Sequence, residues 1–191
     1  MYFAVSYTAA DNLGIAPTTS DSATMTHTLA QRSPSTPVIQ GLPLFKPPYG
    51  RVTALNMNTG ELEWSVANGD GPRDHPLLRE LDLPPLGIPN RPAPLVTKSL
   101  LFVGEGSDAV VGTVPGGGGA YDSADTGYDE SWRWGRLFRA FDKSTGATVF
   151  EIDLAAGTTG APMTYMHEGK QYIVVAVSSR ATDPEWVALG L

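Results

Sequence analysis

The sequence predicts an all-β fold, and three observations support this prediction. First, 21 glycines and 16 prolines stand among the 191 residues, whereas only 17% of the residues are charged. This balance is typical of many short strands joined by turns. Second, short apolar runs alternate with turn-forming residues along the chain. Third, one pattern of eleven residues occurs twice. The 41% content of apolar residues is sufficient for a folded core.

The repeated pattern reads Ala-Leu-Asn-Met-Asn-Thr-Gly-Glu-Leu-Glu-Trp at 54–64 and Ala-Phe-Asp-Lys-Ser-Thr-Gly-Ala-Thr-Val-Phe at 140–150. Each copy is predicted to form a strand, a tight turn and a second strand. Gly60 and Gly146 supply the positive φ that a short hairpin loop with a bulge requires. The two copies therefore indicate two equivalent β-hairpins.

Each copy of the pattern ends in a large aromatic residue, Trp64 or Phe150. We expect each ring at the end of its second strand, where it can wedge between neighbouring sheets. If the Trp64 side chain is fully buried, its removal is expected to cost about 3–5 kcal/mol.

Further strands are predicted on both sides of these hairpins. They form pairs at 93–105, about a Lys98-Ser99 turn, and at 161–177, about a Glu168-Gly169 turn, with single strands at 1–6 and 186–191. The cycle of strand pair, hairpin and strand pair is typical of four-stranded β-propeller blades, which run to about 40–50 residues in well-known repeat classes. The chain holds roughly two and a half blades, whereas closed propellers need about four to eight. We therefore expect a partial β-propeller that belongs to a longer protein or a larger assembly.

Three connections separate these strands. Residues 9–40 have neither a helical nor a strand period and are predicted to be a long irregular loop. Residues 68–92 and 107–135 are predicted to be insertions on the surface. The whole chain, 1–191, is thus read as one set of blades that carries one irregular loop and two insertions.

Charge and cysteine content exclude several functional classes. The net charge of −7, without a basic cluster, lacks the electrostatic signature of a protein that binds nucleic acid. The absence of cysteine excludes disulfides and thiolate metal sites. No apolar run approaches the ~20 residues that span a bilayer, and the first residues do not read as a signal peptide. Any export signal is expected upstream of this chain.

Three segments resemble the pyrroloquinoline quinone (PQQ)-dependent dehydrogenases, in particular the glucose-dehydrogenase-like branch of these quinoproteins. They are Gly-Leu-Pro-Leu-Phe-Lys-Pro-Pro-Tyr-Gly-Arg-Val-Thr-Ala-Leu at 41–55, Pro-Leu-Val-Thr-Lys-Ser-Leu-Leu-Phe-Val-Gly at 94–104 and Pro-Met-Thr-Tyr-Met-His-Glu-Gly-Lys-Gln-Tyr-Ile-Val-Val-Ala at 162–176. The resemblance implies that the chain is the C-terminal part of an eight-bladed, quinoprotein alcohol dehydrogenase-like propeller. The repeated pattern is similar to the tryptophan-docking motif of that family, in which a Trp stacks on the Thr-Gly turn of the next blade. Phe150 stands for Trp and Asn56 for the usual Asp, so both docking contacts are expected to be weaker than in the family.

The resemblance also implies an activity. Family members oxidise sugars or alcohols with PQQ and a divalent metal, usually calcium, and pass electrons to ubiquinone or a cytochrome in the periplasm. Their catalytic carboxylate belongs to a blade before the matched region, so no catalytic residue is assigned to this chain. The metal ligands and the remaining blades are likewise expected upstream, and the isolated fragment is expected to be inactive.

Four residues are candidates for contact with the cofactor by the same resemblance. Ser6 matches a family Asn that hydrogen-bonds the quinone. Ser178, Ser179 and Arg180 occupy a segment that faces the quinone in the family. A guanidinium at Arg180 can pair with the carboxylates of the quinone, and the alternative is an ordinary surface arginine.

Other candidate residues have simpler alternatives. His27, His75 and His167 lack short-range ligand partners, so no histidine metal site is predicted; His75 has the alternative of lining a cleft above the propeller. The glycines at 116–119 lack the context of a phosphate loop, and the acidic residues at 122–130 do not match a calcium loop. Trp132 and Trp134 either stack on a sugar or a quinone or pack back onto the domain.

Two functions remain open from the sequence. The first is part of a dehydrogenase that supplies scaffold and part of the cofactor pocket. The second is a non-catalytic propeller module used for assembly or binding. The sequence at 178–180 departs from the family and favours the second, whereas the long matching segments favour the first.

Overall fold

The computed structural model describes residues 2–7, 12–17, 24, 27–33, 38–90, 92–107 and 134–190. Antiparallel strands make up nearly all of its regular structure, with one short 3-10 helix at Arg79–Leu81, which confirms the all-β prediction. No helix of the described residues is long and apolar enough to cross a membrane.

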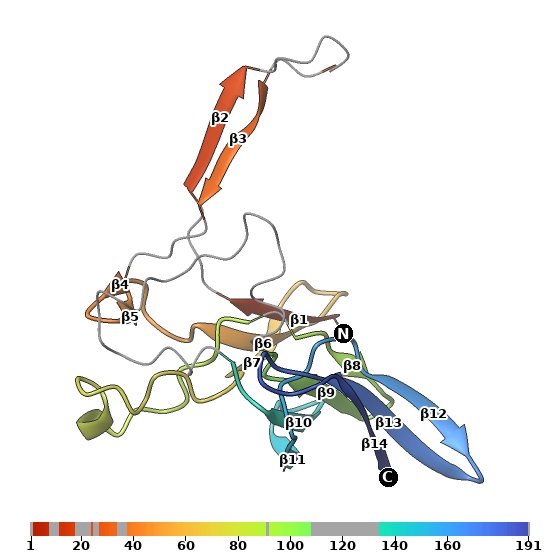
Figure 1. Cartoon of the computed structure of the whole chain (residues 1–191). Coiled ribbons are helices and arrows are strands. Elements are labelled where there is room, and N and C mark those ends of the chain that lie inside the picture. Colours follow the sequence, from red (N-terminus) through yellow and green to blue (C-terminus); the bar gives the residue numbers. More distant parts are fainter. Residues whose placement is uncertain are drawn as a thin grey trace.

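Three sheets form the body of the molecule (Figure 1). The first sheet has the order β1-β6-β7, with β1 at Tyr2–Tyr7, β6 at Gly50–Leu55 and β7 at Leu62–Ala67. The second has the order β11-β10-β9-β8, with β8 at Leu95–Val96, β9 at Leu100–Gly104, β10 at Leu137–Asp142 and β11 at Thr148–Asp153. The third has the order β12-β13-β14, with β12 at Met163–His167, β13 at Lys170–Val177 and β14 at Glu185–Gly190. The final strand therefore extends the third sheet.

Both predicted hairpins are present, as β6–β7 and β10–β11. Each contains a register shift of the bulge type. The shift lies between Ala54 and Leu55 in the first hairpin and between Ala140 and Phe141 in the second. Gly60 and Gly146 have φ values of 76° and 75°, which is the backbone conformation that the sequence predicted. The turn residues in the sequence therefore predicted both hairpins correctly.

Trp64 joins the first sheet to the second. Its indole Nε1–H donates a hydrogen bond of 2.9 Å to the backbone oxygen of Lys143, in the turn of the second hairpin. A Cβ on Gly146 would lie only 2.7 Å from the Trp64 ring, so the ring lies against the backbone of this turn. Trp64 is the third residue of β7 rather than its last, which corrects its expected position. Phe150 takes the matching place in β11 but is 48% exposed, and it does not lie between two sheets of the described chain.

The second sheet lies between the other two. Leu101, Val103 and Phe141 pack against Val52, Ala54 and Trp64 of the first sheet. Phe102, Phe138 and Ala140 lie on the opposite face and pack with Ile173, Val175 and Val177 of the third. Successive residues of a strand point to opposite faces, so the continuous apolar run of β9 reflects burial on both sides.

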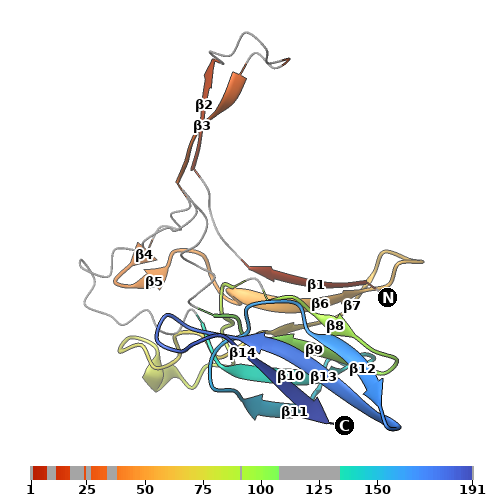
Figure 2. The ribbon, with the colours of Figure 1, turned by 45° about the vertical axis from the view of Figure 1, so that its right-hand side comes forward.

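Short turns and long connections lie at opposite ends of the three sheets. Figure 2 shows the turns between β6 and β7, β8 and β9, and β12 and β13 on one side of the body. The long connections leave from the other ends of these strands, after β1, β7, β9 and β13. Connections that a rigid scaffold gathers at one end are the usual place for a binding site.

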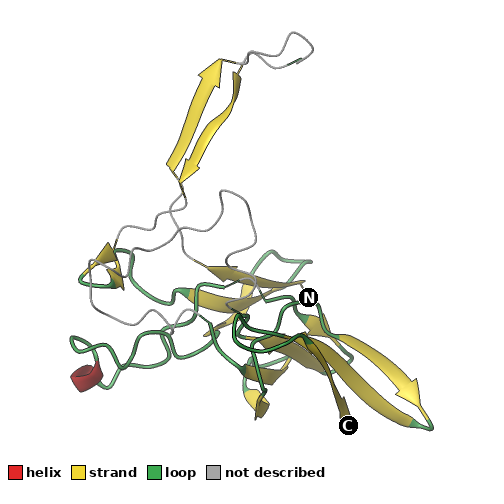
Figure 3. Cartoon of the chain, in the orientation of Figure 1, coloured by secondary structure: helices red, strands yellow, loops and turns green. Residues whose placement is uncertain are grey.

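The segment 9–40 is not wholly irregular, which corrects the prediction. It contains β2 at Asn12–Pro17 and β3 at His27–Ser33, which pair only with each other. Their ribbon stands away from the three sheets (Figure 3). The strand period that reveals a half-buried sheet arises from packing on a core, and a ribbon outside the sheets lacks that constraint. The short strands β4 at Val38–Ile39 and β5 at Leu42–Pro43 follow.

The two ends of the insertion 68–92 are packed onto the body, whereas most of the residues at 76–85 are exposed. Asn68, Leu86 and Ile88 are buried, with at most 5% of their surface exposed. Backbone hydrogen bonds run from Leu86 N to Asp70 O and from Ile88 N to Asn68 O, so the insertion folds back on itself. Of the other insertion, residues 108–133 lie outside the described residues, together with the glycines at 116–119, the acidic residues at 122–130 and Trp132.

Candidate functional site

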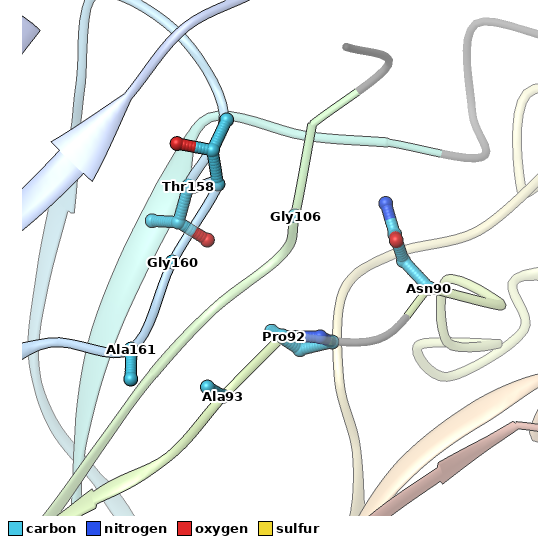
Figure 4. A pocket seen from close by; sticks show the side chains of 8 residues that line it. Asn90, Pro92, Ala93, Gly106, Thr158, Gly160 and Ala161 are labelled. Atoms are coloured by element: carbon cyan, nitrogen blue, oxygen red, sulfur yellow. The ribbon is translucent and has the colours of Figure 1, made fainter. Parts of the chain in front are cut away.

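A pocket opens at the end of the sheets that carries the long connections. Its cavity volume is about 80 Å³, and the pocket is partly open to solvent. Three segments line it, namely the end of the 68–92 insertion with the residues just after it, the residue Gly106 after β9, and the connection before β12 (Figure 4). The lining residues are Asn90, Pro92, Ala93, Gly106, Thr158, Thr159, Gly160 and Ala161.

Close backbone contacts hold these segments together. Gly106 has φ of +85°, and a Cβ there would lie 2.6 Å from the Asn90 side chain. A Cβ on Gly157 would lie 2.4 Å from the backbone oxygen of Gly106. Such contacts need glycine at both places. The pocket wall therefore consists of backbone, uncharged polar side chains and small apolar side chains, and it contains no charged side chain.

The predicted segment Ser178 to Arg180 lies beside this pocket. Ser178 directly follows β13, and its backbone N–H donates to Gly157 O at 3.1 Å. The Ser107 hydroxyl donates to the backbone oxygen of Ser178. Ser178 is buried, with 9% of its surface exposed. The structure thus uses the backbone of Ser178 to fix the segment.

The other two residues of the segment are more open. Ser179 is half-buried, and its hydroxyl oxygen accepts a hydrogen bond of 3.1 Å from Ala181 N. Arg180 is exposed. A backbone hydrogen bond of 3.3 Å from Ser179 N to Thr182 O closes a turn around Arg180. The guanidinium is therefore carried on a small ordered turn at the same end as the pocket.

Ser6 is placed on a different sheet. It is the last but one residue of β1 and pairs in register with Arg51 of β6. Because the second sheet separates the first from the third, the structure groups Ser178, Ser179 and Arg180 with the pocket and sets Ser6 on the far side of the second sheet.

A largely buried ion network includes Glu105, the residue before Gly106 of the pocket wall, and sequence reasoning did not find it. Arg139 Nη1 lies 2.7 Å from Glu105 Oε1, and its Nε lies 2.5 Å from Glu151 Oε2. Burial raises the pKa of the Glu105 carboxyl above its usual value, and Arg139 opposes part of this shift. The sequence signal was available, because an arginine in the otherwise apolar strand β10 needs a buried partner.

The Glu105 carboxylate also orders the pocket wall. Its Oε2 accepts a hydrogen bond of 3.2 Å from Leu137 N, next to its contact with Arg139. Glu105 precedes Gly106, so the network anchors the backbone that lines the pocket. The desolvation of both charges offsets much of their attraction, so such a pair is weak evidence for stability. Its hydrogen bonds nevertheless orient the Glu105 carboxylate.

The histidines and Trp134 have structural settings. His75 is buried, its Nε2 lies 2.9 Å from Gln40 O, and its Nδ1 accepts from Leu77 N at 3.1 Å. His75 therefore fastens the insertion to the preceding segment, and it is not among the residues that line the pocket. His167 is exposed at the end of β12, and Trp134 is half-buried. The part of the chain that the structure describes holds no group of three or more His, Cys, Asp or Glu side chains placed to bind a metal.

Comparisons with known proteins agree with this architecture. The model of the family "PQQ: Glucose/ethanol/alcohol dehydrogenase, beta-propeller domain" matches residues 6–173. The quinate/shikimate dehydrogenase (quinone) of Acinetobacter baylyi is 29% identical over 148 residues, which is 76% of this chain and 15% of that protein. Quinoprotein glucose dehydrogenase A of Acinetobacter calcoaceticus is 27% identical over 136 residues, covering 71% of this chain and 14% of that protein. The glycerol dehydrogenase large subunit of Gluconobacter thailandicus is 28% identical over 138 residues, covering 71% and 15%.

The chain spans about 15% of the length of the curated relatives that it matches. The family model nevertheless covers most of the chain, and it includes the paired hairpins, the Trp64 contact and part of the pocket wall. The chain belongs to the PQQ family of glucose, ethanol and alcohol dehydrogenase β-propeller domains.

Proposed function

We propose that this chain forms blades near the C-terminus of a PQQ-dependent dehydrogenase that oxidises a sugar or an alcohol. The observation that carries the proposal is the pocket at the connection end, with the Ser178 to Arg180 segment beside it. In this proposal the chain supplies scaffold and part of the cofactor pocket. The remaining blades and the catalytic carboxylate belong to other parts of the protein.

The residues at this end suit a cofactor that carries carboxylates. Arg180 offers a guanidinium that can bind a carboxylate through two hydrogen bonds. Ser179, and Ser6 on the first sheet, offer the hydroxyl chemistry to donate or accept single hydrogen bonds. When bound, PQQ would accept the two electrons of the oxidation, and these residues would hold and orient it. We propose that most ligands of any calcium ion beside it lie in other parts of the protein.

The uncharged lining of the pocket supports a proposal about the substrate class. Asn90, Thr158 and Thr159 present amide and hydroxyl groups without charge, which suits a neutral molecule with several hydroxyls. Relatives are named for quinate, glucose and glycerol, which all carry hydroxyl groups. We propose a sugar or a simple alcohol as substrate, a quinone such as ubiquinone or a cytochrome as electron acceptor, and the periplasm as the compartment.

The test uses the full-length protein, reconstituted with PQQ and calcium. Dye-linked oxidation of at least one aldose or alcohol is the expected result. Arg180→Ala should raise the Kd for PQQ, whereas Arg73→Ala, which removes an arginine that pairs with Asp70 on the insertion, should leave it unchanged. Failure of the wild-type protein to bind PQQ or to oxidise any of these compounds would overturn the proposal.

A non-catalytic propeller module is the second candidate. The burial of Ser178 favours it, because only 9% of the surface of this residue is exposed for contact with a ligand. The two functions differ in one measurement. A scaffold module should show no saturable change in absorbance or fluorescence when the full-length protein is titrated with PQQ, whereas the dehydrogenase should.

A further inference from the structure

Ser107 stands at the junction between the second and third sheets, at the pocket end. It follows β9 at a distance of three residues and is 1% exposed. Its hydroxyl donates to the backbone oxygen of Ser178, the first residue after β13. A buried hydroxyl that donates to a backbone acceptor on another sheet fixes the distance between the two sheets at that place.

Ser178 is held on its other side as well. Its backbone N–H donates to Gly157 O at 3.1 Å, and Thr159 N donates to Ala176 O at 3.0 Å. Thr158 also forms an isolated antiparallel bridge with Val177. Both partners of Ser178 therefore come from connections of the second sheet.

These partners are sequence neighbours of the pocket wall. Ser107 follows Gly106, and Gly157 precedes Thr158, and both Gly106 and Thr158 line the pocket. We propose that Ser107 is a positioning residue that sets the Ser178 to Arg180 turn against the pocket. This inference rests on the proposed function, because it concerns how that site is assembled. Loss of the Ser107 hydroxyl would leave a buried acceptor on Ser178 without its donor and free the start of the turn.

The first test measures cofactor binding in the full-length protein. Ser107→Ala should raise the Kd for PQQ by about 10-fold, with kcat at saturating cofactor less affected. Ser107→Thr, which keeps the hydroxyl, should restore part of the affinity. Trp64→Ala is the matched control for instability, because its contact lies at the opposite end of the sheets. It should lower the Tm while leaving the Kd within about two-fold of wild type at a temperature where the protein is folded.

A Kd unchanged by Ser107→Ala, or a Kd that simply follows the Tm in both variants, would overturn the inference. A second measurement does not depend on the cofactor. Hydrogen exchange of amides 178–182 without PQQ should be about 10-fold faster in Ser107→Ala than in wild type, with no change in the β6–β7 hairpin. If the wild-type protein does not bind PQQ, the proposed function fails while this exchange result still decides whether Ser107 positions the turn. Equal exchange at 178–182 in the two proteins contradicts the inference.

Discussion

Trp64 is the residue whose contacts bear most directly on how two sheets are held together. Its ring lies against Gly146, its N–H donates to Lys143 O, and only 8% of its surface is exposed. An indole buried with its N–H satisfied combines a large apolar contact with a directional hydrogen bond. Trp186 lies in β14 and is 74% exposed, so the chain contains its own control for the loss of an indole.

Trp64→Ala should lower the free energy of unfolding by about 3–5 kcal/mol, because it leaves a cavity and removes the hydrogen bond to Lys143 O. Trp186→Ala should change it by less than about 0.5 kcal/mol. Urea unfolding followed by circular dichroism measures both. Equal changes in the two variants would mean that the Trp64 contact does not hold the sheets.

Replacement of Gly146 has two expected costs, the left-handed backbone conformation and the collision with the Trp64 ring. A comparison with Gly60 separates them. The two glycines have nearly the same φ, but a Cβ on Gly60 meets no atom within 4 Å. Gly60→Ala should therefore lower the free energy of unfolding only by the penalty of the left-handed conformation for alanine, about 1–2 kcal/mol. Gly146→Ala should cost about 1–3 kcal/mol more, because its methyl group collides with the Trp64 ring. In a Trp64→Ala background this excess should vanish in urea unfolding; an excess that persists would place its origin elsewhere.

At the scale of the element, the two hairpins reach the same shape through different polar contacts. In the second, Asp142 Oδ1 accepts from Ser144 N at 2.8 Å, Ser144 Oγ at 2.5 Å and Thr145 N at 3.0 Å. In the first, Asn56 Oδ1 accepts from Asn58 N at 3.0 Å, and its Nδ2 donates to Glu63 Oε1 at 2.8 Å. The asparagine thus gains a cross-strand partner that Asp142 lacks, since Val149 takes the position of Glu63 in the second copy of the repeat.

The Asp142 turn should respond to acid. Hydrogen bonds from the Ser144 hydroxyl and backbone, and then from Thr145, lower the pKa of the Asp142 carboxyl from its ordinary value of 3.8. A lowered folded-state pKa contributes stability that is fully present above the ordinary pKa and is lost as the pH falls through the folded-state pKa. NMR titration of the turn should show this transition below pH 3.8. Asp142→Asn should abolish it, and a transition at the ordinary value would contradict the prediction.

The Asn56 contact predicts that placing an aspartate at position 56, as in the second copy of the repeat, is harmful on its own. Asn56→Asp brings a carboxylate against Glu63, so it should lower the free energy of unfolding by about 0.2–1 kcal/mol, the range of cross-strand pairs. The double variant Asn56→Asp with Glu63→Val copies the second hairpin and should recover the loss. Thermal unfolding at neutral pH compares the three proteins. A gain in stability from Asn56→Asp alone would show that the Glu63 contact is unimportant.

At the scale of the whole molecule, the second sheet is the centre of the packing. Both faces of β9 are buried, by the first sheet on one side and the third on the other. β12 is the contrasting strand, because it lies at the edge of its sheet and all five of its residues are exposed. Local stability in proteins follows such differences in burial.

Hydrogen exchange should therefore rank the strands. The hydrogen-bonded amides of β9 should exchange most slowly, at a rate set by global unfolding, and those of β12 should exchange fastest among the strands of the three sheets. Mass spectrometry of peptides from the full chain gives both rates under the same conditions. Comparable protection of β9 and β12 would contradict the central place of the second sheet.

The sequence by itself determined the local elements of this protein. Turn residues such as Gly60 and Gly146 require a backbone conformation that neighbours in the chain decide, so both hairpins were predicted with their bulges. The run of β9 and the segments shared with the family were equally visible, because alternation and motif spacing are properties of short stretches.

Tertiary structure alone decided which elements meet. The Trp64 contact with a turn 79 residues away, the Glu105–Arg139 pair and the bond from Ser107 to Ser178 all join segments distant in sequence. Burial of the two ends of the 68–92 insertion is of the same kind. The physical reason is that dihedral preferences act between neighbouring residues, whereas packing partners are chosen by shape, burial and hydrogen bonding once the sheets come together.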